Sequence, residues 1–109
     1  MNENDLQKLL ACKFSSMNYG RLWVNDNGLG FRKTGQGFKY GLGPGSSDLI
    51  GFTLIEGKPI FTAFEVKMPK GYATKEQKSY IRMVQEQGGI AGIVRNWEDI
   101  EELIKKPTN

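Results

Sequence analysis

The 109-residue chain contains no histidine and only one cysteine. Without histidine, the chain cannot build Ser-His-Asp or Cys-His nucleophile systems, zinc sites with histidine ligands, or nuclease sites whose general base is an imidazole. Any acid–base or metal chemistry must therefore use Asp, Glu, Lys, Tyr and amide groups. Cys12 has no second cysteine to pair with, so no disulfide forms within the chain, and we expect a small buried or helix-flanking apolar residue there.

Long apolar runs are also missing. No run approaches the 18 residues of a membrane-spanning helix, so we expect no membrane partner. The opening residues 1–5 are not typical of a signal peptide, and a lone thiol suits a reducing compartment. We therefore expect a cytoplasmic protein, or one in the host cytoplasm if a phage encodes it. The length predicts a single domain over residues 1–109.

The charge is unevenly distributed along the chain. The net charge is +3, but residues 13–82 hold 11 basic against 5 acidic residues, whereas the two ends together are net acidic. A basic middle is typical of a surface that faces a polyanion. Ordinary solvated lysines would give the same count, so charge alone leaves the two interpretations open.

Hydrophobic spacing and turn residues predict seven regular elements. We expect three helices, at residues 3–14, 75–87 and 97–106, and four strands, at residues 20–25, 48–55, 60–67 and 90–94. This order predicts an α/β single domain with one central mixed β-sheet flanked by helices.

The segment 28–47 matches neither period and holds seven of the 14 glycines. No regular element is expected there. The segment could be a flexible linker, but the aromatic and basic residues between its glycines favour an ordered loop that contacts DNA or forms a dimer. These residues are Phe31, Arg32, Lys33, Phe38, Lys39 and Tyr40.

Two adjacent strands bring charged residues onto one face of the sheet. If residues 56–59 form a four-residue turn, Asp48 lies opposite Lys67 and Ile50 lies opposite Glu65. Asp48, Glu65 and Lys67 then share a face at the open end of the hairpin. A turn of odd length would move Asp48 to the other face, so this prediction depends on the register.

Glu65 follows a strand that is apolar on both faces, and a buried carboxylate must be paired or bound to a cation. One interpretation is a structural ion pair of Lys67 with Glu65 or Asp48. The other is a hard cation such as Mg²⁺, because two carboxylates and one ammonium leave a negative charge uncompensated.

Gln77 and Glu3 each allow two interpretations. Gln77 faces the sheet, where it could complete a site, but Thr74 and Gln77 also match a helix capping box. Glu3 shares the apolar face of its helix with Leu6 and Leu10; it is either part of the site or an acid favoured by the helix dipole.

Four basic residues follow the Glu-x-Lys strand. They could clamp phosphates beside a carboxylate metal site, although a solvated helix face is the usual role of such a run. They are Lys70, Lys75, Lys78 and Arg82.

The ordered set of these motifs resembles the VRR-NUC (virus-type replication-repair nuclease) domain of the PD-(D/E)xK nuclease superfamily. Ser47 stands where the superfamily name has proline. The motifs that carry the resemblance are Glu3-x-x-Leu6-Gln7, Gly45-Ser46-Ser47-Asp48, Glu65-Val66-Lys67, Gly71-x-x-Thr74-x-x-Gln77 and Gly88-Gly89-x-Ala91-x-Ile93-Val94-Arg95.

The resemblance implies a restriction-endonuclease-like core of order α-β-β-β-α-β-α and Mg²⁺- or Mn²⁺-dependent hydrolysis of phosphodiester bonds. It implies that Asp48, Glu65 and the Val66 carbonyl hold the metal. Glu3 would complete the metal shell directly or through a water molecule.

The resemblance further implies that Lys67 orients or activates the attacking water and that Gln77 positions Lys67 or that water. Stand-alone domains of this kind resemble homodimeric four-way-junction (Holliday-junction) resolvases, so branched DNA and a second copy of the chain are the expected partners. Contacts with DNA are expected from Arg32, Lys33, Lys39, Lys70, Lys75, Lys78 and Arg82.

Two alternatives stay open. The chain could be a non-catalytic nucleic-acid-binding module that uses its basic middle and glycine–aromatic loop. It could also be a non-enzymatic interaction protein in which Asp48, Glu65 and Lys67 form a structural ion network. Cleavage of branched DNA with Mg²⁺ or Mn²⁺ would separate both from an enzyme.

Overall fold

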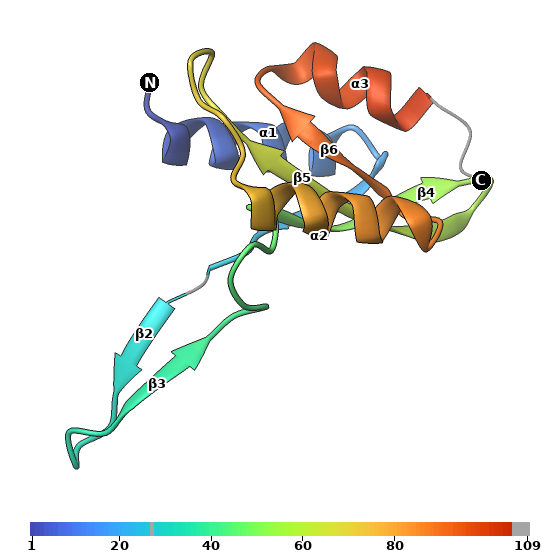
Figure 1. Ribbon diagram of the computed structural model, residues 1–109. Coiled ribbons are helices and arrows are strands. Elements are labelled where there is room, and N and C mark those ends of the chain that lie inside the picture. Colours follow the sequence, from blue (N-terminus) through green and yellow to red (C-terminus); the bar gives the residue numbers. More distant parts are fainter. Residues whose placement is uncertain (27, 106–109) are drawn as a thin grey trace.

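A computed structural model describes residues 1–26 and 28–105 (Figure 1). Predicted and observed elements agree closely, except in the glycine-rich segment; Lys106, the predicted end of the last helix, lies outside the described residues. The elements are α1 (Glu3–Ser16), β1 (Gly20–Val24), β2 (Gly28–Phe31), β3 (Gly37–Tyr40), β4 (Leu49–Ile55), β5 (Lys58–Val66), α2 (Lys75–Glu86), β6 (Ile90–Val94) and α3 (Trp97–Lys105).

A four-stranded mixed sheet of order β1-β4-β5-β6 forms the centre of the molecule. The first three strands pair antiparallel, and β6 runs parallel to β5 because α2 carries the chain back across the sheet. Helices α1 and α3 cover one face, and α2 covers the other (Figure 1). The predicted α/β class and its core order are therefore confirmed, with a hairpin inserted between β1 and β4.

The larger core lies under α1 and α3. Helix α1 begins with a capping box between Asn2 and Asp5, and its buried Leu6, Leu10 and Phe14 recur at helical spacing as predicted. These side chains pack against the sheet residues Leu22, Leu49, Phe64, Val66, Ile90 and Val94 and against Ile100. A smaller cluster under α2 contains Ala63, Ile81, Val84 and Ala91. Both faces of β5 are thus buried near its end, which explains why Glu65 is only 1% exposed.

The turn between β4 and β5 is shorter than predicted. Glu56 and Gly57 both have positive φ angles, 52° and 77°, so they form a two-residue turn whose twist matches that of the strands. Lys58 already belongs to β5, and the four-residue turn is wrong. The observed pairs Leu49↔Phe64 and Ile50↔Ala63 shift the register by two residues.

This shift preserves the face on which each side chain lies. Asp48 now lies opposite Glu65 rather than Lys67, and Ile50 no longer faces Glu65. Because two residues equal one full period of a strand, Asp48, Glu65 and Lys67 still share a face.

We expected no regular element in the glycine-rich segment, and this prediction is wrong. The segment forms a separate two-stranded sheet of β2 and β3 that projects from the body (Figure 1), and residues 28–40 are called the arm from here on. Gly35, with a φ angle of 87°, allows the turn at its tip, and the glycines inside the strands hid the alternating pattern.

Cys12 lies exposed on α1 rather than buried. Among the described residues, no helix has the length and apolar character needed to cross a membrane.

Candidate active site

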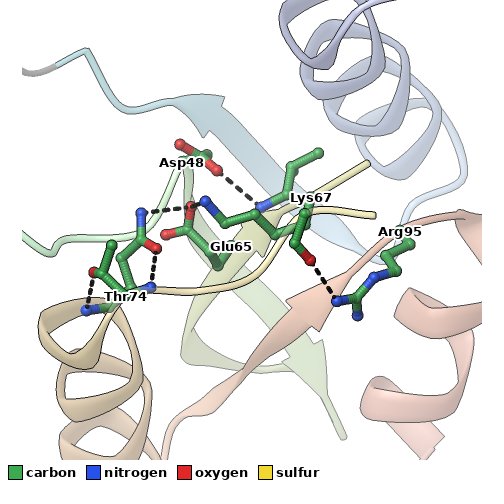
Figure 2. Close-up of polar contacts among 8 residues, drawn as sticks. Asp48, Glu65, Lys67, Thr74 and Arg95 are labelled. Atoms are coloured by element: carbon green, nitrogen blue, oxygen red, sulfur yellow. Dashed lines mark hydrogen bonds and ion pairs between the residues drawn. The ribbon is translucent and has the colours of Figure 1, made fainter. Parts of the chain in front are cut away.

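Side chains from three segments converge where β5 ends. Asp48 comes from the residue before β4, Glu65 and Lys67 from the end of β5, and Gln77 from the first turn of α2 (Figure 2). The sequence predicted this convergence, although through a different register.

Asp48 is fixed against the neighbouring strand. Its Oδ2 accepts a hydrogen bond of 2.8 Å from the Val66 backbone N–H. The N–H and C=O groups of one strand residue point to the same side, so the Val66 carbonyl also faces Asp48. The structure thus brings together the three oxygen-bearing groups that the resemblance assigned to a metal.

Glu65 is a buried carboxylate with incomplete hydrogen bonding. Its Oε2 accepts a bond of 3.2 Å from Gln77 Nε2 and lies 3.8 Å from Lys67 Nζ (Figure 2). Its Oε1 has no partner among the described residues. An unpaired buried oxygen costs free energy, so this atom is a natural position for a ligand that the protein alone does not supply.

The pKa of Glu65 is raised from 4.5 to about 9, most of all by burial and then by the hydrogen bond and the negative charge of Asp48. The Lys67 ammonium lowers the pKa, but its contribution is smaller. One ammonium therefore does not keep both adjacent carboxylates charged, and Glu65 retains its proton at neutral pH in the metal-free protein.

Gln77 forms the predicted helix cap and also reaches the site, where its partner is Glu65; its positioning of Lys67 or of the attacking water stays a prediction. Its Oε1 accepts a bond of 2.8 Å from the Thr74 N–H, and Thr74 Oγ1 accepts one of 3.1 Å from the Gln77 N–H, which completes the capping box. The same amide donates through Nε2 to Glu65. Because the cap fixes which end of the amide faces Glu65, α2 delivers a hydrogen-bond donor to the site.

Lys67 is held at its backbone by the neighbouring strand. Its N–H donates a bond of 3.1 Å to the Val94 carbonyl, and its side chain is 14% exposed. The loop that follows is fastened by Arg95, whose Nη2 donates a bond of 2.9 Å to the Gly71 carbonyl (Figure 2). Arg95 stood in the sequence motif without an assigned role, and the structure makes it a tether for this loop.

Asn25 is a site-organising residue that sequence reasoning missed. Its Nδ2 donates bonds of 2.9 Å to Ser46 Oγ and to the Ser47 carbonyl. Its backbone N–H donates a bond of 2.7 Å to the Asp48 carbonyl. The residues before Asp48 are therefore clamped to the end of β1, and only its place directly after a predicted strand hinted at this role.

A cleft of about 520 Å³ opens on the other side of Asp48. Its lining is mostly polar and includes a cation from α1, Lys8, that sequence reasoning did not single out. The lining residues are Asn4, Gln7, Lys8, Val24, Asn25, Asp26 and Asp48. The volume lies in the range of ligand-binding clefts, and Asp48 is one of the two carboxylates that line it.

Glu3 lies half-buried at the start of α1, and its negative charge helps to raise the pKa of Glu65. Among the described residues, no three Asp, Glu or Cys side chains converge into a metal-binding cluster. Glu3 therefore does not join Asp48 and Glu65 directly, and its contact with a metal through water stays a prediction.

The predicted basic residues fall into two groups. One group is exposed around the site, in the loop after β5 and along one side of α2: Lys70, Lys75, Lys78 and Arg82. The other group, Arg32, Lys33 and Lys39, is exposed on the arm and is not brought to the carboxylates (Figure 1).

The donor set fits a hard divalent cation. Two carboxylates and a backbone carbonyl are all oxygen donors, which suit Mg²⁺ and Mn²⁺. Two observations favour a cation here: Glu65 Oε1 has no partner among the described residues, and the raised pKa of Glu65 indicates that Lys67 alone does not stabilise the charged form of this carboxylate.

Comparison with known families supports the resemblance seen in the motifs. The family model described as the VRR-NUC domain matches residues 1–97. No curated protein matches the chain. The matched region contains the arm, the carboxylates and all of the basic residues named above.

Proposed function

The chain belongs to the VRR-NUC domain family, and from this premise we propose that it is a metal-dependent, structure-selective DNA endonuclease. Family membership implies a nuclease-type function, that is, a hydrolase with DNA as its substrate. Divalent metals are general in this family. The use of Mg²⁺ or Mn²⁺, the preference for branched DNA and the residue roles below are our proposal.

One observation supports catalysis more than any other. Half-buried Asp48 lies against the fully buried Glu65, beside Lys67 Nζ, and Glu65 Oε1 has no partner among the described residues. A purely DNA-binding module gains nothing from such a site, since each buried charge reduces stability unless it is fully paired. A structural ion network would be expected to keep both carboxylates charged and paired, whereas Glu65, with a pKa of about 9, stays neutral at pH 7 unless a cation is bound.

We propose that Asp48, Glu65 and the Val66 carbonyl hold the metal. When bound, the metal lowers the pKa of a water molecule and neutralises charge on the reacting phosphate. Lys67 Nζ donates hydrogen bonds to the attacking water and to the phosphate oxygens, where negative charge develops. Gln77 keeps Glu65 in place through Oε2, which leaves Oε1 for the metal.

The basic residues around the site are proposed to bind DNA phosphates. Lys75 and Lys78 lie within the first turns of α2, and Arg82 lies about 10 Å beyond Lys75 along the axis. Lys70 stands in the loop between Lys67 and α2. Together they would carry a DNA backbone past Lys67 and along the exposed side of α2.

A four-way junction is the proposed substrate, and the proposed active form is a homodimer. Each chain carries one Asp48–Glu65–Lys67 site, and cutting two strands symmetrically needs two sites related by a two-fold axis. A cytoplasmic location, where the chain would meet DNA, is part of the same proposal.

A cleavage assay tests this function. The purified protein is incubated with linear duplex, flap and four-way-junction DNA in Mg²⁺, Mn²⁺ or EDTA. We expect the junction to be cut with either metal and not with EDTA, and we expect Asp48→Ala and Lys67→Ala to abolish cutting while leaving binding largely intact. Glu102→Gln, an exposed charge change on α3, is the control and should cut normally.

If the wild-type protein binds junctions but cuts none of these substrates with any metal, the enzyme proposal fails. The chain would then be a nucleic-acid-binding module.

A further inference from the structure

The arm has no evident task in the site itself. It stands away from the sheet (Figure 1) and makes the molecule elongated, with principal extents of 49 × 31 × 28 Å. A protruding ribbon of glycine-rich strands contributes little to the core. The arm is therefore free to reach a partner.

The electrostatic character of the arm indicates a polyanionic partner. No Asp or Glu occurs anywhere between residues 28 and 47, whereas Arg32, Lys33 and Lys39 all lie exposed on the arm. Elsewhere in the chain, basic and acidic residues are interspersed. A surface of this size with cations and no acid favours phosphate over protein or lipid-tail contacts.

One face of the arm is built to hold an arginine. The Phe38 ring lies over Gly30 so closely that a Cβ added at Gly30 would be 2.5 Å from the ring. The Arg32 guanidinium in turn lies 5.3 Å from the centre of the Phe38 ring. A side chain at position 30 would displace the Phe38 ring, and in the present arrangement the ring presents the Arg32 guanidinium in a defined place.

The opposite face carries apolar side chains. Leu29 and Phe31 alternate with the glycines, and they are 60% and 69% exposed. Lys39 lies directly across from Leu29 on the same face. Apolar groups next to a cation fit the edge of a base pair, where thymine methyl groups and hydrogen-bond acceptors stand side by side.

We propose that the arm enters the major groove of a duplex segment beside the cut, so that intact duplex on this side is part of the substrate. This inference rests on the proposed function. A two-stranded β-ribbon has the width that the major groove admits. Arg32, Lys33 and Lys39 contact phosphates and base edges, and Leu29 and Phe31 contact thymine methyl groups.

The base of the arm ties groove binding to the active site. Only seven residues separate the end of β3 from Asp48. Asn25, which precedes the arm, holds Ser46 and Ser47, which follow it. A duplex bound by the arm is thereby set at a defined position relative to Asp48, and single-stranded DNA offers no groove for this contact.

Salt-dependent binding to a four-way junction in EDTA tests the proposal. The double variant Lys33→Gln/Lys39→Gln is compared with Lys58→Gln/Lys105→Gln, which makes the same charge change at exposed positions off the arm. Each lost phosphate contact makes the negative slope of log K against log salt shallower by about 0.9. The slope should therefore become shallower by about 1.8 for the arm variant and change little for the control. Equal slopes for the two variants would overturn the proposal.

Chemical footprinting identifies the groove. We expect wild-type protein in EDTA to protect guanine N7, in the major groove, from dimethyl sulfate, and Phe31→Ser to lose this protection. Protection confined to adenine N3, in the minor groove, would overturn the assignment. Sedimentation without DNA tests whether the arm instead joins two copies of the chain. If the particle formed by Phe31→Ser has half the mass of the wild-type particle, the arm forms a dimer and the proposal is wrong.

Cleavage separates this inference from the function on which it rests. Two branched substrates are compared, one whose branches are duplex and one whose branches are single-stranded. The arm variant Lys33→Gln/Lys39→Gln should cleave the duplex substrate at least tenfold more slowly than wild type does. Its cleavage rate on the single-stranded substrate should stay within twofold of the wild-type rate. If wild type cuts and the arm variant cuts both equally, only the inference fails. If wild type cuts nothing, the proposed function fails, while the binding and footprinting results still decide the arm.

Discussion

Replacing Glu65 with glutamine should stabilise the metal-free protein at neutral pH. Below pH 4.5 the carboxyl is protonated in the folded and unfolded states alike. Above it, the unfolded chain loses the proton whereas the folded protein retains it up to about pH 9, so the free energy of unfolding falls as pH rises through this window. At about 1.4 kcal/mol per pH unit, the loss at about pH 7.5 reaches up to about 4 kcal/mol.

Glu65→Gln removes this loss because glutamine has nearly the same shape and does not titrate. At about 4 °C per kcal/mol, the gain at neutral pH corresponds to a rise in Tm of roughly 15 °C. In acid the two proteins should be equally stable, since Glu65 is then neutral in both states. The exposed Glu102→Gln variant is the matched control and should leave both the stability and its pH dependence unchanged.

Urea unfolding followed by circular dichroism in EDTA measures the effect between about pH 4 and pH 9. Excess Mg²⁺ should then stabilise the wild-type protein and leave Glu65→Gln unaffected, because a ligand stabilises only the state that binds it. The reasoning is refuted if Glu65→Gln is less stable than wild type at neutral pH in EDTA, or if wild-type stability does not fall between about pH 5 and pH 8.

Three further substitutions examine how the site is held. Asn25→Ala should lower the free energy of unfolding, measured in urea, by about 1–3 kcal/mol, since Asn25 Nδ2 donates two hydrogen bonds. Asn25→Asp lacks those donors and should lose as much. Unchanged stability in both variants would show that these bonds do not stabilise the protein. Gln77→Glu keeps a capping-box residue but brings a further acidic group next to the Asp48–Glu65 pair, where burial and the charge of Asp48 disfavour its ionised form. It should therefore reduce stability at neutral pH more than in acid; equal losses at both would argue against this contact. Lys67→Met should lower the cleavage rate by about 100-fold or more while junction affinity, measured by titration, changes little; a parallel loss of affinity would make Lys67 a binding residue.

Much of the fold was predictable because its core elements are strongly patterned. The helical spacing of Leu6, Leu10 and Phe14 identified α1, and the apolar stretch before Glu65 identified a strand buried on both faces. The site was predictable for a related reason. Strand side chains alternate with a period of two, so a register error of two residues left Asp48 and Glu65 on one face.

The features that the sequence did not reveal depend on contacts between distant segments. Glycines at positions 28, 30 and 37 masked the strands of the arm, because glycine has neither strand propensity nor a side chain that shows alternation. Asn25 clamps residues more than twenty positions away, and nothing local signals such a bond. The dual role of Gln77 was visible only as two competing possibilities, since a cap and a site contact use opposite ends of one amide.

The place where the arm joins the body makes it an exchangeable module. Val24 pairs with Leu49, so the chain leaves the sheet and returns to it at one pair of neighbouring residues, which is called the junction pair below. Hairpins of different length or composition can be inserted at the junction pair without altering the order of the core strands, because doubling the length of a loop costs only about 0.6 kcal/mol in closure entropy. Such a graft must keep Asn25 and Ser46, which form the joint. A common hydrolytic core can thereby acquire new DNA preferences by replacing one hairpin, while its chemistry is inherited unchanged.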